Sequence, residues 1–134
     1  KDEMGETGRD LTLSLSRLAY VTRNEADRRA KVDAAQHYYG RFDNVFTGPG
    51  IVENGMVREL PRAQSAEDLA ASLLIGSPQE MVDKLMPYQE LGIDRVILNV
   101  NFGCNAQETI EAIHCFAEEV MPFFTGRTTI AAAE

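Results

Sequence analysis

Two segments of this chain each predict a β-strand that runs directly into a capped α-helix. Residues 11–22 (LTLSLSRLAYVT) first alternate apolar with hydroxyl-bearing side chains and then become apolar, as in a strand buried on at least one face. Residues 93–100 (IDRVILNV) hold a continuous apolar stretch, as in a parallel strand covered on both faces. Because a strand precedes a helix twice, we expect parallel strands joined by crossover helices, in an α/β barrel or a doubly wound sheet.

The predicted helices begin at recognisable capping patterns. Three sites place an N-cap residue three positions before a glutamate: Thr22 with Glu25, Ser77 with Glu80, and Asn105 with Glu108. Pro78 strengthens the second start, because the first helical position needs no backbone N–H donor. The patterns predict helices over residues 24–39 (ended by Gly40), 78–91 (bent at Pro87 and ended by Gly92) and 106–124.

Apolar periodicity predicts which side of each outer helix faces the core. In the first helix, the repeating positions are Ala26, Ala30, Ala34 and Tyr38. In the last helix, they are Ile110, Ile113, Ala117, Val120 and Phe124. We expect both sets to pack against the sheet.

The segment from about residue 41 to residue 72 predicts a long mobile insertion. It carries the turn-forming pairs Gly48-Pro49 and Asn54-Gly55, and it lacks a sustained period until Ser65. From Ser65, an N-cap followed by acidic residues predicts a short helix over residues 66–74. Connections longer than about 15 residues are usually functional or mobile. Residues 1–10 predict a ragged or disordered start, and residues 125–134 a flexible tail.

Composition and charge narrow the class of protein. The length of 134 residues suits one domain, and 44% hydrophobic residues suffice for a core. A net charge of −8 disfavours nucleic acid and anionic membranes as partners. Cys104 and Cys115 lack metal-ligand spacing, so we expect free thiols, no metal site and a cytoplasmic location. No apolar run approaches the roughly 20 residues that span a bilayer.

The candidate binding residues follow the two predicted strands, because ligands gather at the carboxyl ends of parallel strands. Asn99 and Asn101 flank one residue and should project to the same side, where their amides can donate and accept hydrogen bonds. The alternative is that both serve the turn. Thr22 is a candidate at the other strand end, with N-capping as its alternative.

Tyr38 and Tyr39 precede the predicted insertion and could line a pocket for a flat ligand, or simply pack on the surface. His114 has no identifiable base or orienting carboxylate nearby, and no nucleophile with a matching base is evident. We therefore name no catalytic residue. The residues alone predict an α/β ligand-binding fragment.

A family resemblance extends this interpretation. The run LLIGSPQEMVDKLMPYQELGIDRVILNVNFG, followed by a helix ending in AEEVMPFF, resembles the C-terminal part of the bacterial-luciferase-like flavin-dependent monooxygenases. The preceding run RLAYVTRNEADRRAKVDAAQHYY resembles the segment just upstream in that family. The similarity covers about residues 11–124.

The resemblance implies the C-terminal portion of a TIM (β/α)8 barrel, in which residues 11–22 form the seventh strand and residues 94–101 the eighth. Residues 41–72 would match a mobile loop that closes over flavin and substrate. By position, Thr22 matches a residue near the isoalloxazine, and Tyr38 or Tyr39 matches an aromatic over the pocket. Family members use reduced FMN, or F420 in a sister branch, and the oxygenases insert an oxygen atom from O2 into a small organic substrate.

A whole barrel takes about 250 residues, so we expect a C-terminal fragment that is inactive alone and does not bind FMN by itself. Two strands would leave unpaired edges and an open apolar face, which predicts a homo-oligomer. Two alternatives remain. The parent protein could be an F420-dependent oxidoreductase, or the chain could be a non-catalytic assembly module.

Overall fold

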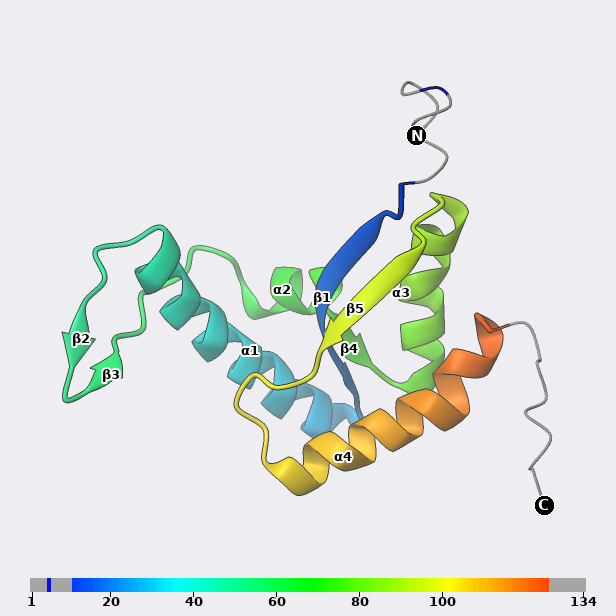
Figure 1. Cartoon of the computed structure of the whole chain (residues 1–134). Coiled ribbons are helices and arrows are strands. Elements are labelled where there is room, and N and C mark those ends of the chain that lie inside the picture. Colours follow the sequence, from blue (N-terminus) through cyan, green and yellow to red (C-terminus); the bar gives the residue numbers. More distant parts are fainter. Residues whose placement is uncertain (1–4, 6–10, 126–134) are drawn as a thin grey trace, which may run out of the picture.

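A three-stranded parallel sheet lies at the centre of the structure, a computed structural model that describes Gly5 and residues 11–125 (Figure 1). Its strands are β1 (Ser14–Val21), β4 (Leu74–Gly76) and β5 (Arg95–Asn99), in the order β4-β1-β5. The two predicted strands are present and pair in parallel, as expected. The mixed α/β class is therefore confirmed.

β1 pairs with its two neighbours at different heights. Its amino-terminal half pairs with β5, from Ser14 opposite Arg95 to Leu18 opposite Asn99. Its carboxyl-terminal half pairs with β4, beginning with Ala19 opposite Leu74. As a result, β5 ends well short of the carboxyl end of β1.

β4 corrects a prediction. The expected helix over residues 66–74 ends earlier, as α2 (Ala66–Ser72), and the next residues form a strand. Both Leu74 and Ile75 are fully buried, and they belong to different core clusters on opposite faces of the sheet. A run of three apolar residues is consistent with a helix end or a buried strand, and only pairing with β1 decides between them. The sheet thus has three strands, where the sequence predicted two.

The strand order places β1 between two strands that follow it in the chain. β4 and β5 are consecutive along the sequence, yet each pairs with β1 and not with the other. Such a reversal is characteristic of doubly wound sheets, whereas consecutive strands of a TIM barrel pair in chain order.

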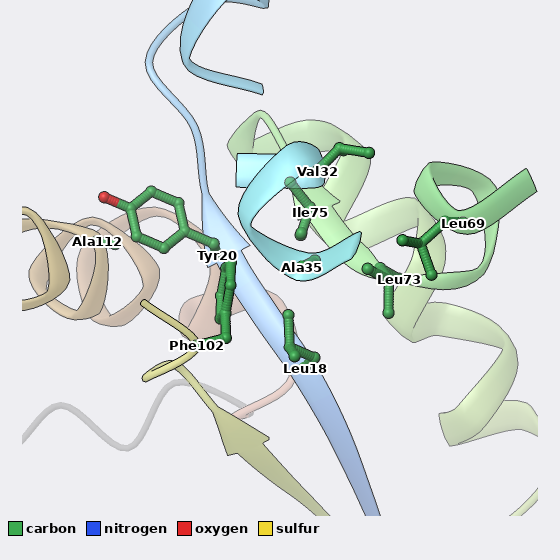
Figure 2. Packing of buried hydrophobic residues seen from close by; sticks show 9 residues of the cluster. All are labelled: Leu18, Tyr20, Val32, Ala35, Leu69, Leu73, Ile75, Phe102 and Ala112. Atoms are coloured by element: carbon green, nitrogen blue, oxygen red, sulfur yellow. The ribbon is translucent and has the colours of Figure 1, made fainter. Parts of the chain in front are cut away.

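Helices cover both faces of the sheet. α1 (Glu25–Phe46) and α2 pack on one face, and α3 (Pro78–Glu90) packs on the other together with a π-helical turn, η2 (Phe116–Val120). α4 (Ala106–Cys115) crosses near the carboxyl end of β1 (Figure 1). Figure 2 shows the core of the first face, which consists of Leu18, Tyr20, Val32, Ala35, Leu69, Leu73, Ile75, Phe102 and Ala112.

α1 continues past Gly40, where the sequence predicted its end, and stops at Phe46. A Cβ atom at Gly40 would lie 2.5 Å from Cγ of Glu59 and 2.9 Å from the carbonyl oxygen of Leu60. The backbone N–H of Leu60 donates to the carbonyl of Gly40 at 3.1 Å. This glycine therefore permits a close approach to the helix and does not terminate it.

The buried sides of the outer helices also differ from the prediction. Ala34 and Tyr38 pack against the core as predicted, whereas Ala26 and Ala30 are exposed. The fully buried side of α1 instead carries Lys31, Val32 and Ala35. In the last helix, only Val120 of the predicted positions is buried, while Ile110 and Ile113 are 50% and 46% exposed. The predicted single helix is also divided into α4, η2 and a 3₁₀ turn, η3 (Met121–Phe123).

The predicted insertion contains regular structure. It includes the end of α1, a hairpin of β2 (Val52–Glu53) and β3 (Met56–Val57), and α2. We call residues 40–60 the arm, which projects away from the sheet with the hairpin at its tip (Figure 1). The hairpin turns through Asn54 and Gly55, which both have positive φ, as their turn-forming pair predicts.

Three of the four predicted caps are present, among them Ser65 at α2, whose side chain accepts from the N–H of Asp68. Ser77 and Glu80 form a complete capping box at α3, and the Asn105 side chain accepts from the N–H of Glu108 at α4. Thr22 does not cap α1, which corrects the fourth. Asn24 caps that helix, and the N–H of Thr22 instead donates to the carbonyl of Gly76 at 2.8 Å, extending the sheet.

The Glu80 cap predicts a pH dependence of stability. The backbone hydrogen bond from Ser77, 2.7 Å long, holds the pKa of Glu80 below its usual 4.5. Because the folded pKa is the lower one, this stabilisation is complete above about pH 4.5 and is lost as pH falls through the folded value. The Glu80 side chain is 44% exposed, so we expect less than ~1 kcal/mol.

The test compares urea unfolding of the native chain and Glu80→Gln between pH 7 and pH 3. The native chain should lose its advantage over the variant as the carboxylate protonates. A stability difference that stays constant over this range would contradict the prediction.

Among the described residues, no helix is long and apolar enough to cross a membrane.

Candidate functional site

The carboxyl end of β1 is the place where the described elements converge. α1 begins there, the loop after β5 returns there, and α4 crosses it (Figure 1). The chain order reverses between β1 and β5, and ligands of open parallel sheets bind outside the carboxyl ends at such a reversal. We therefore take this edge as the candidate functional site.

A buried lysine ties α1 to α4 at this edge. Nζ of Lys31 lies 2.7 Å from Oε2 of Glu108 and 4.8 Å from the ring centre of Tyr20. The Tyr20 hydroxyl donates to the backbone carbonyl of Glu108 at 3.0 Å, and its ring meets Phe102 edge to face. These contacts join β1, α1, the β5–α4 loop and the first turn of α4.

The charges of this cluster are set by burial and by the ion pair. Burial by itself lowers the pKa of Lys31, but the hydrogen bond to Glu108 and neighbouring groups outweigh it, so the pKa of Lys31 is raised. The same hydrogen bond lowers the pKa of Glu108. Burial raises the pKa of Tyr20, partly offset by Lys31. At neutral pH the lysine is charged and the tyrosine is neutral.

The two thiols at this edge are not activated nucleophiles. Burial raises the pKa of Cys104, although Lys31 opposes the shift. Burial, together with the hydrogen bond from the thiol to Glu119, raises the pKa of Cys115 to about 11. Because the reactive form is the thiolate, neither cysteine is poised to attack a substrate at neutral pH. The edge therefore offers binding surface more than acid, base or nucleophile.

Thr22 is buried and borders a cleft of about 300 Å³ at the end of β1. Acidic side chains dominate the lining of this cleft, with Glu108, Glu111 and Glu119 from the α4 side. Its one lining cation, Arg23, is paired with Glu111. This donor set does not suit the phosphate of a flavin mononucleotide.

The structure places Asn99 apart from Thr22, and Asn101 lies two residues beyond the end of β5. Asn99 lies opposite Leu18, four residues before Thr22, or roughly 13 Å along the strand. The side-chain oxygen Oδ1 of Asn99 accepts a hydrogen bond from the backbone N–H of Asn101 at 3.3 Å, so this oxygen stabilises the turn. The amide N–H groups remain suited to ligand contact.

Tyr38 and Tyr39 do not join the carboxyl edge. They lie about 20 Å along α1 from its first residue, where the arm leaves the sheet. Their rings meet edge to face at 5.5 Å, and the Arg62 guanidinium covers Tyr39 at 5.0 Å. The structure thus places the predicted lid residues away from Thr22 at the carboxyl edge.

Sequence reasoning missed Lys31, Tyr20 and Glu108 as a unit. One signal was present, because Lys31 lies four residues before Ala35 on the side of α1 that is buried. A basic residue on a buried helical face needs a partner. The identity of that partner, 77 residues away, depends on the tertiary fold.

Removing the Lys31 ammonium should loosen α4. We expect Lys31→Met to lower the free energy of unfolding by about 1 kcal/mol, because a charge-assisted hydrogen bond is lost while Glu108 keeps access to water. Arg29→Met is the matched control, since that side chain is 80% exposed and its pair with Glu25 is worth little. Equal effects of the two variants in urea unfolding would show that Lys31 is not an anchor.

Comparison with known proteins identifies a distant relative. No protein-family model matches this chain, and no solved structure matches it. The chain is 23% identical over 120 residues to the oxygenase component of a flavin-dependent trigonelline monooxygenase from Acinetobacter baylyi (strain ATCC 33305 / BD413 / ADP1). The alignment covers 84% of this chain and 33% of that relative, so the chain spans about one third of the relative's length.

Proposed function

We propose that this chain is the C-terminal part of the oxygenase of a flavin-dependent monooxygenase, within the luciferase-like lineage. The observation that carries the proposal is the alignment over 120 residues with an oxygenase component of that activity. The proposed activity belongs to the full-length protein, which uses reduced flavin and O2 to oxygenate a small organic molecule. The 134-residue chain alone is proposed to be inactive.

The strand-helix units of the fold support this proposal. Parallel strands with crossover helices are the units from which a (β/α)8 barrel is built. With β4 included, β1, β4 and β5 would be the last three strands of that barrel. The proposal requires β4 and β5 to become neighbours once the other strands are present, in place of the pairing between β1 and β5.

The described residues would form only part of a flavin-binding site. The amides of Asn99 and Asn101, with Thr22, are proposed to form a polar wall beside the cofactor. At the carboxyl edge, Arg23 and Lys31 are already paired with carboxylates, so the phosphate must be held by other residues of the full-length protein. A bound reduced flavin supplies the electrons with which such enzymes activate O2. FMN is the proposed cofactor, with F420 as the alternative.

Tyr38 and Tyr39 are proposed to contact the substrate from the arm in the full-length protein. The proposed homo-oligomer rests on exposed apolar groups at the sheet edge and the arm. Ile97 on the edge strand β5 is 50% exposed, and Phe46 at the end of α1 is 68% exposed. Such groups are usually covered by another chain or domain.

The decisive experiment uses the full-length protein, obtained by extending the reading frame upstream of Lys1. We expect on the order of 200 additional residues, because the 120 aligned residues make up 33% of the relative, whose length exceeds the roughly 250 residues of a bare barrel. The purified protein should bind FMN. When it is supplied with reduced FMN, a small organic substrate and isotopically labelled O2, one labelled oxygen atom should enter the product and the other should leave as water. A deazaflavin absorbance spectrum would select F420, and a full-length protein that binds neither cofactor would refute the proposal.

Two measurements on the 134-residue chain complete the test. FMN fluorescence should stay unquenched when the chain is added, and light scattering after size exclusion should show an oligomer. Stoichiometric FMN binding by this chain would contradict the partial-site proposal. A well-folded monomer would contradict self-association.

A further inference from the structure

An apolar cavity of about 260 Å³, partly open to solvent, lies beneath α4. It adjoins the cleft that Thr22 borders, and Tyr20, Val21 and Ala112 line both. The carboxyl halves of β1 and β5 line one side of it, and the helical segments after the last strand line the other. The side chains that form most of its wall are Val21, Met81, Leu98, Val100, Ile113 and Phe116.

Two features of its position are typical of ligand sites. The cavity lies between β1 and β5, where the strand order reverses, and at their carboxyl ends. It is also bordered by η2, and π-helical turns occur frequently at functional sites. Neither feature depends on the resemblance to monooxygenases.

The lining selects for an uncharged ligand. Tyr20 contributes the one hydroxyl group among the lining residues, and that hydroxyl already donates to the carbonyl of Glu108. No lining residue carries a charge. A charged group placed there would lose its hydration without gaining a partner, whereas an apolar ring would exchange water for carbon contacts.

The volume sets the size of the ligand. An engineered apolar cavity of about 150 Å³ in another protein accommodates benzene. At about 260 Å³, this cavity has room for a larger ring system. We propose that it binds small neutral molecules of one or two fused rings, for which indole is a suitable probe. The site does not include Thr22, Asn99 or Asn101 of the proposed flavin wall and does not require flavin chemistry.

The test titrates indole into the 134-residue chain and follows binding by calorimetry and ligand-detected NMR. We expect saturable binding of one molecule per chain with a dissociation constant on the order of 1 mM, from burial of the apolar surface of the ring. Indole-3-acetate should bind at least about tenfold more weakly, because its carboxylate would be buried without a partner. Equal affinities for the two probes would overturn the proposal.

Matched variants locate the site. Ala117 lines the cavity and is exposed, so Ala117→Phe should fill the cavity and abolish saturable indole binding. Ala106 is exposed on α4 but does not line the cavity, so Ala106→Phe should bind indole like the native chain. Binding that survives Ala117→Phe would place the ligand elsewhere and refute the assignment.

A second measurement needs no variant. In the native chain, nuclear Overhauser contacts should connect indole protons with methyl groups of Val21, Leu98 and Ile113. Contacts with other methyl groups in their place, or no saturable binding up to the solubility of indole, would overturn the proposal. The cavity depends on the pairing of β1 with β5 in the 134-residue chain, which the proposed full-length barrel would replace. Because this test uses the 134-residue chain without flavin, its failure would leave the proposed monooxygenase function standing.

Discussion

Replacing Asn44 with alanine is expected to release the β2–β3 hairpin from α1, at a cost of about 3 kcal/mol. Asn44 is fully buried, and its Nδ2 donates to the carbonyls of Ile51 and Arg58 at 2.8 and 2.7 Å. Its Oδ1 accepts from the N–H of Ile51 at 2.9 Å. One side chain thus satisfies three backbone groups where the arm folds back, and alanine would leave all three without it.

Hydrogen exchange of the arm measures this effect. A loss of about 3 kcal/mol corresponds to roughly 100-fold faster exchange at the amides of Ile51 and Arg58, if local opening dominates there. Val45→Ala is the control, because Val45 is the next residue on α1 and is 52% exposed. Unchanged exchange in the Asn44 variant would mean that the arm is held by other contacts.

Replacing Lys84 with methionine is expected to lower the free energy of unfolding by about 2 kcal/mol. Nζ of Lys84 donates to the carbonyls of Ala70 and Leu73 at 2.8 Å each, and to that of Ile75 at 3.2 Å. These acceptors lie in the last turn of α2, at the residue that caps it, and in β4. Burial lowers the pKa of Lys84, so removing the ammonium recovers part of the loss, which keeps the expected effect moderate.

Urea unfolding followed by far-UV circular dichroism is the suitable measurement, because the chain has no tryptophan. Asp83→Ala serves as the control, since Asp83 is the preceding, exposed residue of α3. The Lys84 variant should lose stability and the control should not. Equal stability of both variants would show that the α2–β4 junction does not depend on the ammonium.

Local signals predicted several elements because the interactions behind them span only a few residues. The capping box of Ser77 and Glu80 and the proline between them act within one helical turn, and α3 begins where they predict. The sequence of β1 likewise predicts the observed strand: exposure alternates over its first four residues, and its last four are buried on both faces. Thr22 failed as a cap because Asn24 also has a capping side chain, and local spacing alone does not choose between them.

The sequence predicted where the candidate site lies better than it predicted which residues form it. The carboxyl ends of parallel strands were the expected place, and Thr22 does border a cleft there. The register of β5 against β1 then set Asn99 lower than Thr22, and the extension of α1 carried Tyr38 and Tyr39 away from the edge. Register and helix length depend on pairing and packing partners that are remote in sequence.

By itself, the sequence determined the starts of α3 and α4, the strands β1 and β5, and the parallel α/β class, since periodicity and capping depend on neighbouring residues. The tertiary structure alone decided that Leu74–Gly76 becomes a strand and that α1 passes through Gly40. It also decided that Lys31 and Asn44 are buried and Lys84 is half-buried, each hydrogen-bonded to groups outside its own helix. Those outcomes depend on which backbone groups and charges meet across the fold, because a buried polar group must find a partner wherever the chain brings one.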